Sequence, residues 1–346
     1  MKKWGVIICF MFISVTIFGQ DHGGNIQNYY SKLYKAQSFI VDKKLDSASI
    51  IFNGLTSLYN KKSNVIDIYN ALVLNFINKN RKQVRFCLKL LSSKNVSIAR
   101  LLNIKAIDSL VHINPNFVGL KDINKYDRSY KLYPCVKELD SAYQIDQNVR
   151  FNKENYTSVQ GKRAMYLVDS INAYFLTKYL DMYGFNDYEE VLYDTINNIS
   201  KLETMILHQT TWKRSQYINR IEKGIEDLEI KPGIAYYIID LFKGSSKHET
   251  IALYQFKAED SGCNTSYKNK WLSFEYGPEI LDRINNIRKN DLLENWDFYI
   301  RKSAFSLHNT LFNWHSPFTI SVLNFASCSE LTSFLNNPKF KIKIIE

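Results

Sequence analysis

The sequence predicts a mainly α-helical fold with a small mixed α/β part at its C-terminal end. Apolar residues recur at helical spacing from residue 26 to about 111 and again from 136 to 243. In the last hundred residues, β-like runs at 250–256 and 340–345 lie on either side of a helical pattern at 280–300. The chain has 346 residues, of which 45% are hydrophobic, which is enough to build the cores of two domains.

The first nineteen residues have the pattern of a cleavable signal peptide. Lys2 and Lys3 precede an uncharged apolar run at 4–18, which is short for a membrane span, and Gly19 provides a small residue for cleavage. An uncleaved anchor is the alternative, and no lipid anchor is expected because Cys9 lies inside the apolar run. We therefore expect a periplasmic or secreted protein. No second apolar run of spanning length follows, so we expect no transmembrane segment in the mature chain.

Residues 25–112 are expected to form an array of paired helices. Small and large apolar residues alternate in two stretches about 35 residues apart, at Ala36, Phe39, Ala48 and Phe52 and then at Ala71, Leu74, Val84 and Leu88. The spacing is close to the period of about 34 residues in tetratricopeptide repeats, and the region resembles such repeats. Because a helical array buries its apolar faces by stacking, we expect it to lean on the region that follows. An ordinary helical bundle is the alternative.

A break in the helical pattern divides the rest of the chain. Pro115 and a polar run that ends at Pro134 interrupt the pattern, so we place a domain boundary between about 113 and 133. We expect a helical domain at 134–243, followed by a mixed region at 244–346.

The second helical region carries polar elements in a fixed order. They are Asp146-Gln147 with Arg150, Asp169 with Asn172, the helix stop Tyr183-Gly184-Phe185, His208, and Ile238-Ile239-Asp240. In these elements and their order, residues 136–243 resemble a bacterial family of secreted or periplasmic proteins of unknown function. The resemblance implies a helical domain outside the cytoplasm, and the family has no established reaction to carry over.

Four of these polar residues are the predicted binding site for a polar ligand. Asp146 and Arg150 are four residues apart and can pair on one face of a helix. Gln147 lies beside them in the sequence, and Asn172 adds an amide from the next helix. A buried polar network that fixes the register of the helices is the alternative, because it uses the same residue types.

Three residues form a predicted catalytic set. His208, oriented by the carboxylate of Asp169 or Asp240, has the chemistry of a general base. Such a group would make the protein a hydrolase-like enzyme. A structural role for the histidine is again the alternative.

No cofactor is expected. The sequence contains no Gly-rich phosphate loop and no strained serine turn of the kind that hydrolases use. His248-Glu249 begins like a zinc-binding helix motif, but Ala252 takes the place of the second histidine, so no metal site is predicted.

The net charge indicates which partners to expect, and the cysteines indicate which disulfide bonds can form. The formal net charge of +11 comes from scattered Lys and Arg residues, so no nucleic-acid partner is expected, while contact with an anionic surface stays open. After the signal peptide the cysteines are Cys87, Cys135, Cys263 and Cys328. They allow three full disulfide pairings, and buried free thiols are the alternative.

The leading functional hypothesis is a binding module in the cell envelope. Helical arrays usually present a groove to a protein or peptide partner, and the hydrolase-like enzyme is the alternative. An aromatic-rich stretch at 296–314, near His308 and His315, fits either a sugar-stacking surface, a partner site or core packing. Its helical spacing favours the core. The oligomeric state stays open.

Overall fold

The computed structural model describes most of the chain. The described residues are 22–60, 62–94, 96–118, 134–152, 154–185, 200–209, 211–245, 247–248, 253–258, 270–314, 320–325, 327–336 and 340–345. The predicted signal peptide, most of the predicted boundary at 113–133, Cys263 and His315 lie outside them. Among the described residues, no helix combines the length and the apolarity that a membrane span needs.

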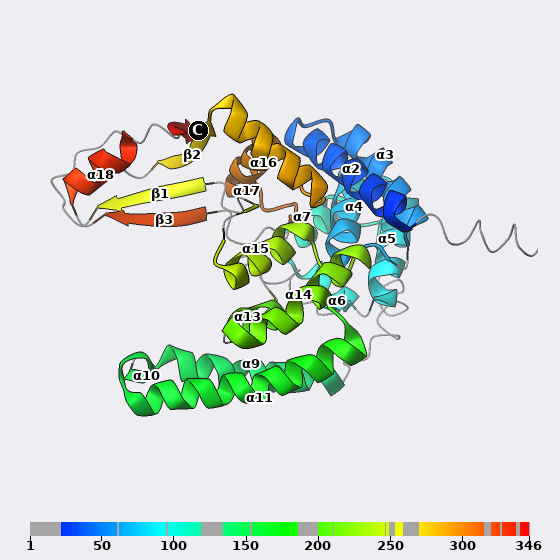
Figure 1. Ribbon diagram of the computed structural model, residues 1–346. Coiled ribbons are helices and arrows are strands. Elements are labelled where there is room, and N and C mark those ends of the chain that lie inside the picture. The colour runs from blue at the N-terminus through cyan, green and yellow to red at the C-terminus, as the bar shows by residue number, and fades with distance from the viewer. Residues whose placement is uncertain are drawn as a thin grey trace, which may run out of the picture.

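The N-terminal region is a helical array, as the sequence predicts. Helices α2 (His22–Val41), α3 (Leu45–Leu58), α4 (Val65–Ile77) and α5 (Arg81–Ser93) pack one after another (Figure 1). Of the eight small and large positions that predicted the array, seven are fully buried and Phe39 is partly buried. The turns after α2 and α4 place Lys43 and Lys79 at φ 59° and 56°, in the left-handed region. The two helix pairs therefore share a turn as well as a packing pattern. The short helices α6 (Ile98–Leu102) and α7 (Lys105–Ile113) continue the array.

The inner side of this array is covered by later parts of the chain. Tyr69 of α4 donates a hydrogen bond to the carbonyl of Leu311 at 3.1 Å, and the side chain of Asn70 exchanges hydrogen bonds with the backbone of Asn313. Asp67 forms a buried ion pair with Lys231. These contacts confirm that the array packs against later parts of the chain.

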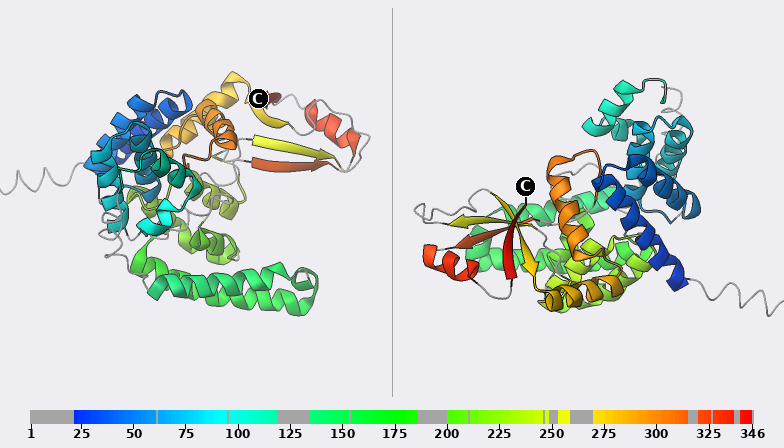
Figure 2. Two further views of the ribbon diagram at one scale, coloured as in Figure 1. Left: turned by 180° about the vertical axis from the view of Figure 1, so that it is seen from behind. Right: turned by 90° about the horizontal axis from the view of Figure 1, so that it is seen from above.

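The second region is also helical, and it begins with a long hairpin. Its helices are α9 (Pro134–Phe151), α10 (Glu154–Thr157), α11 (Val159–Tyr183), α13 (Lys201–Leu207), α14 (Thr211–Glu226) and α15 (Pro232–Lys243). The antiparallel α9 and α11, joined by α10, project from the body of the molecule (Figures 1 and 2). We call these three helices the hairpin.

The predicted helix stop ends α11. Gly184 is the C-cap of α11 at φ 63°, and its N–H donates to the carbonyl of Leu180. A Cβ atom at Gly184 would lie 2.4 Å from a carboxylate oxygen of Glu229. The same carboxylate accepts the N–H of Phe185 at 3.1 Å. Only glycine therefore fits both the left-handed conformation and the close approach.

The C-terminal region is mixed α/β. It contains β1 (Leu253–Ala258), β2 (Trp271–Tyr276), α16 (Pro278–Asn290), α17 (Trp296–His308), β3 (Ile320–Phe325), α18 (Cys328–Leu335) and β4 (Phe340–Ile345). The sheet has the order β3-β1-β2-β4, in which β1 and β3 are parallel and the other two pairs are antiparallel. The helical pattern at 280–300 and the strand at the end are confirmed, whereas the sequence analysis missed β2 and β3.

One hydrophobic core extends through both helical regions. It contains residues from Tyr29 of α2 to Phe242 of α15, together with Phe312 and Trp314. The sheet has two smaller clusters of its own. The aromatic-rich stretch at 296–314 therefore serves the core, since Trp296, Tyr299 and Trp314 are each less than a tenth exposed.

Candidate functional site

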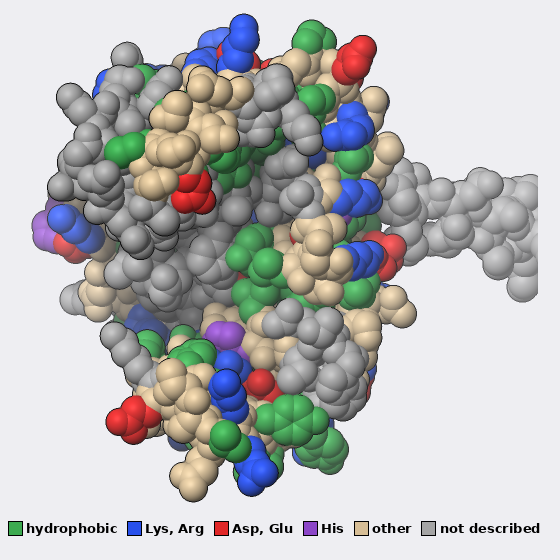
Figure 3. All heavy atoms as spheres, turned by 60° about the vertical axis from the view of Figure 1, so that its left-hand side comes forward, with side chains coloured by type: hydrophobic (Ala, Val, Ile, Leu, Met, Phe, Trp, Pro, Cys, Tyr) green, Lys and Arg blue, Asp and Glu red, His purple; other side chains and the backbone are tan. Residues whose placement is uncertain are grey.

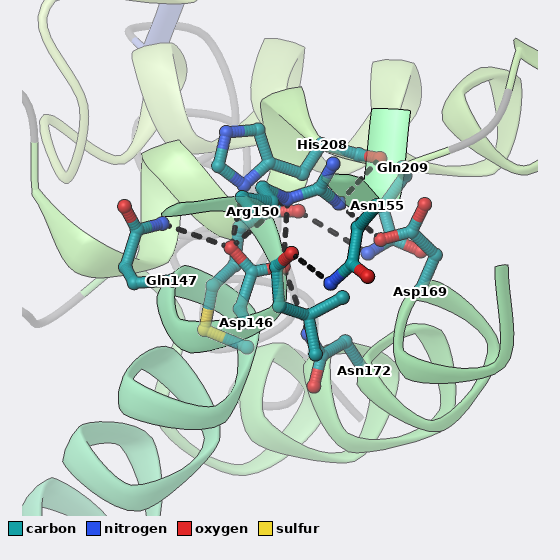
Figure 4. Close-up of polar contacts among 10 residues, drawn as sticks. Asp146, Gln147, Arg150, Asn155, Asp169, Asn172, His208 and Gln209 are labelled. Atoms are coloured by element: carbon teal, nitrogen blue, oxygen red, sulfur yellow. Dashed lines mark hydrogen bonds and ion pairs between the residues drawn. The ribbon is translucent and has the colours of Figure 1, made fainter. Parts of the chain in front are cut away.

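Six of the seven predicted site residues come together between three helices. Asp146, Gln147 and Arg150 lie on α9, Asp169 and Asn172 lie on α11, and His208 caps the C-terminal end of α13. Figure 4 shows their side chains pointing toward one another. The spacing of four residues on α9 and of three on α11 turns these polar side chains to the inner faces of the hairpin.

Asp146 is the centre of this network. Its side chain is fully buried and accepts hydrogen bonds from Gln147 at 2.9 Å, Arg150 at 3.3 Å and Asn172 at 3.3 Å. The ring Nδ1 of His208 lies 2.6 Å from Oδ2, the carboxylate oxygen that also accepts from Gln147. A buried carboxylate needs such partners, because an unpaired one is strongly unfavourable.

The charge on Asp146 is stabilised by its neighbours. Burial alone would raise the pKa of this carboxyl, but the hydrogen bond and charge of His208 and the guanidinium of Arg150 outweigh burial and hold the pKa below its ordinary value. Asp146 is therefore an anion that orients the histidine ring.

Arg150 connects the two helices of the hairpin. Its guanidinium binds Asp146 on its own helix and forms an ion pair with Asp169 on α11. It also lies 3.4 Å from the carbonyl oxygen of His208. Only 16% of the Arg150 side chain is exposed, so the group acts mainly within the network.

His208 is the part of the network that meets solvent. With Nδ1 facing Asp146, the ring leaves Nε2 available, and 27% of the side chain is exposed. The sequence analysis named Asp169 or Asp240 as the partner of this ring. The carboxylate that contacts it is Asp146, which was predicted as a ligand-binding residue.

Asp240 belongs to a different cluster. It accepts the ring Nδ1–H of His248 at 2.8 Å and the backbone N–H of His248 at 3.0 Å. The other ring nitrogen of His248 lies 3.0 Å from Asp291, and Tyr236 stacks on the ring. Both His248 and Asp240 are buried, so this cluster ties α15 to the end of α16. No group of three or more His, Cys, Asp or Glu side chains within the described parts of the chain is arranged to hold a metal ion.

A second candidate site is a cleft between the N-terminal and C-terminal regions. Its volume is about 1170 Å³, and its walls are α2 on one side and α16 and α17 on the other. α2 contributes Gln27, Ser31 and Lys35, and the opposite wall contributes Asn286 and Lys289. The sequence analysis did not identify this cleft, because its walls are about 250 residues apart in the chain and no motif marks them.

The cysteines do not form any of the full pairings. Cys328 is disulfide-bonded, whereas Cys87 is a free thiol buried in the array. Burial raises the pKa of Cys87 to about 12, so its reactive thiolate form is rare. The side chains of Cys135 and Cys263 lie outside the described residues.

Comparisons with protein-family models, with curated proteins and with solved structures found no match to this chain. The resemblance of residues 136–243 to a bacterial family of secreted or periplasmic proteins therefore stays a prediction.

Proposed function

We propose that this is a secreted or periplasmic binding protein that holds an extended peptide segment of a protein partner in the cleft between α2 and the α16 and α17 pair. The cleft itself is the observation that carries the proposal. Its volume of about 1170 Å³ is somewhat above the usual range for small-molecule sites, and both regions of the chain contribute to its walls.

The side chains of the cleft suit a peptide. Gln27 and Asn286 carry side-chain amides, which donate and accept hydrogen bonds as a peptide backbone does. Lys35, Lys289 and Asp297 are exposed, and within the described part of the chain they form no ion pair. They offer both signs of charge to the side chains of a ligand. The disulfide bond of Cys328 supports a location outside the cytoplasm, where disulfides persist.

Site-specific photo-crosslinking tests the proposal. A photoreactive phenylalanine at Ser31 or at Asn286 is expected to crosslink a partner in cells of the source organism. The same group at Ser109, which is exposed on α7 and is not among the lining residues of the cleft, is the control. The substitutions Lys35→Glu and Lys289→Glu together are expected to weaken crosslinking, and Lys105→Glu on α7 is their matched control. Equal crosslinking from Ser109 would contradict the proposal.

A hydrolase-like enzyme is the second candidate, and the contact between His208 and Asp146 favours it. A histidine with one ring nitrogen on a buried carboxylate and the other accessible can take a proton from water. We expect any hydrolysis of activated esters to be lost in His208→Gln and reduced in Asp146→Asn. Turnover that is unchanged in His208→Gln would exclude this candidate.

A further inference from the structure

The hairpin exposes an unusual amount of apolar surface. Among the described residues thirteen large hydrophobic side chains are exposed, and nine of them lie between residues 145 and 182. They are Ile145, Phe151, Tyr156, Val159, Tyr166, Leu167, Ile171, Tyr174 and Met182. Exposed apolar residues that gather in one place mark an interaction surface, whereas single ones need no explanation.

Four of these side chains lie along one line of α11. Leu167, Ile171 and Tyr174 are 61%, 60% and 77% exposed, and Met182 continues the line. Arg163 and Lys178 occupy the same face at helical spacing, and both are exposed. We call these six residues the outer stripe.

The tip of the hairpin adds to this surface. Phe151, Tyr156 and Val159 are 78%, 52% and 69% exposed where α9, α10 and α11 meet. Figure 3, in which the hairpin forms the lower part of the molecule, shows hydrophobic side chains beside Lys and Arg side chains there. The outer stripe is therefore apolar and basic, and the tip adds apolar side chains and the exposed acid Glu154.

The polar network explains why the outer stripe faces away from the core. Asp169 and Asn172 occupy the inner face of α11, where they bind Arg150 and Asp146. A rotation of α11 that buried Leu167 and Ile171 would separate Asn172 from Asp146 and Asp169 from Arg150. The exposed apolar face is thus a fixed property of the fold.

We propose that the outer stripe and the tip of the hairpin dock on an anionic lipid surface. Apolar side chains on a projecting helix enter the boundary between headgroups and acyl chains, and flanking Lys and Arg residues bind anionic headgroups. Arg163, which precedes Leu167, and Lys178, which lies between Tyr174 and Met182, are placed for such contacts. Asp181, the acidic residue near them on α11, is paired with Arg220.

A second copy of the chain fits this surface less well. In an antiparallel two-fold pairing of two α11 helices centred near Ile171, Arg163 of one copy would face Lys178 of the other. Like charges in that position repel, so the charge pattern favours an anionic surface over self-association.

Flotation with lipid vesicles tests the proposal. The probe is vesicles that contain phosphatidylglycerol and phosphatidylcholine, with vesicles of pure phosphatidylcholine for comparison. The chain is used from Gln20 onward in every case, because the apolar run at 4–18 would bind lipid by itself. We expect binding to the anionic vesicles that is at least about tenfold stronger than to the neutral ones and that falls with added salt.

Variants of the outer stripe make the test specific. Leu167→Ser, Ile171→Ser and Tyr174→Ser together, and separately Arg163→Glu with Lys178→Glu, are each expected to weaken binding at least about tenfold. Ile50→Ser with Leu58→Ser is the matched control, since these two side chains of α3 are 73% and 68% exposed. Circular dichroism checks that each variant is folded.

Three results would overturn the proposal. They are equal binding to neutral and anionic vesicles, no binding to either, and an equal loss in the α3 control. Light scattering provides a separate check. A dimer that the stripe variants convert to monomer would assign the surface to a second copy instead. None of these results depends on the cleft, so the proposed function is tested separately.

Discussion

Helices α4 and α11 both carry apolar residues at regular spacing, but the structure places these residues in opposite environments. α4 is apolar on nearly all sides, and twelve of its thirteen residues are buried. α11 instead buries Asp169 and Asn172 and leaves Leu167 and Ile171 more than half exposed. In α4 the apolar area decides which side faces inward, whereas in α11 the polar Asp169 and Asn172 share the inner face with the buried Leu176 and Tyr179.

The largest effect on stability is expected when a buried side chain of α4 is shortened. Leu72→Ala should lower the free energy of unfolding by about 2–5 kcal/mol, because it removes a fully buried side chain from the core. Leu167→Ala on α11 should change it by less than about 0.5 kcal/mol. Urea denaturation followed by circular dichroism measures both values. If Leu167→Ala were as costly as Leu72→Ala, the outer stripe would be covered in solution.

A substitution in the polar network of the hairpin is expected to cost nearly as much stability as Leu72→Ala. Asp146→Asn keeps the shape of the side chain but removes its charge and half of its capacity to accept hydrogen bonds. We expect a loss of about 1–3 kcal/mol and faster hydrogen exchange in α9 and α11. Asp181→Asn is the matched control on an exposed ion pair, for which little change is expected. Equal effects of the two substitutions would show that the network does not hold the hairpin together.

The tip of the hairpin depends on a close contact at Gly161. A Cβ atom there would lie 2.1 Å from the Cα of Asn155, so Gly161→Ala must push α10 away. We expect a loss of about 1–3 kcal/mol. Gly54→Ala in α3 meets nothing within 4 Å and should stabilise the protein by about 0.5–1 kcal/mol. A destabilised Gly54→Ala variant would contradict this account.

The smallest effect is expected in the dependence of the thermal stability on acid pH. The pKa of Asp146 is lowered, and so is that of Glu294, where Lys302 and Arg288 outweigh the opposing effect of burial. Each carboxylate therefore contributes stability above about pH 4, the ordinary carboxyl range, and this stability is lost as the pH falls through the lowered pKa. Thermal unfolding below that pH should show a steep fall in Tm, and a shallower one in Asp146→Asn. If Tm fell equally steeply with pH in both proteins, Asp146 would not contribute to the acid sensitivity.

The sequence predicted the helical array and most of the polar network. Ala36, Ala48 and Phe52 are buried as their spacing requires, and α11 ends at the predicted glycine. The carboxylate partner of His208 could not be predicted, since Asp146 is 62 residues away in the chain and meets it only when α9 and α13 pack together. Strands β2 and β3 were missed, although they have the same length of six residues as the predicted β1 and β4.

The sequence by itself determined the type and the order of the helices and of two strands, because helical spacing, turn residues and the glycine after α11 act over a few neighbouring positions. The tertiary structure decided which faces are buried. Apolar spacing marks the inner face of a helix only when no stronger set of partners lies on the other face. In α11 Asp169 and Asn172 bind Arg150 and Asp146 of α9 on the face that also buries Leu176 and Tyr179, and the outer stripe lies on the opposite face.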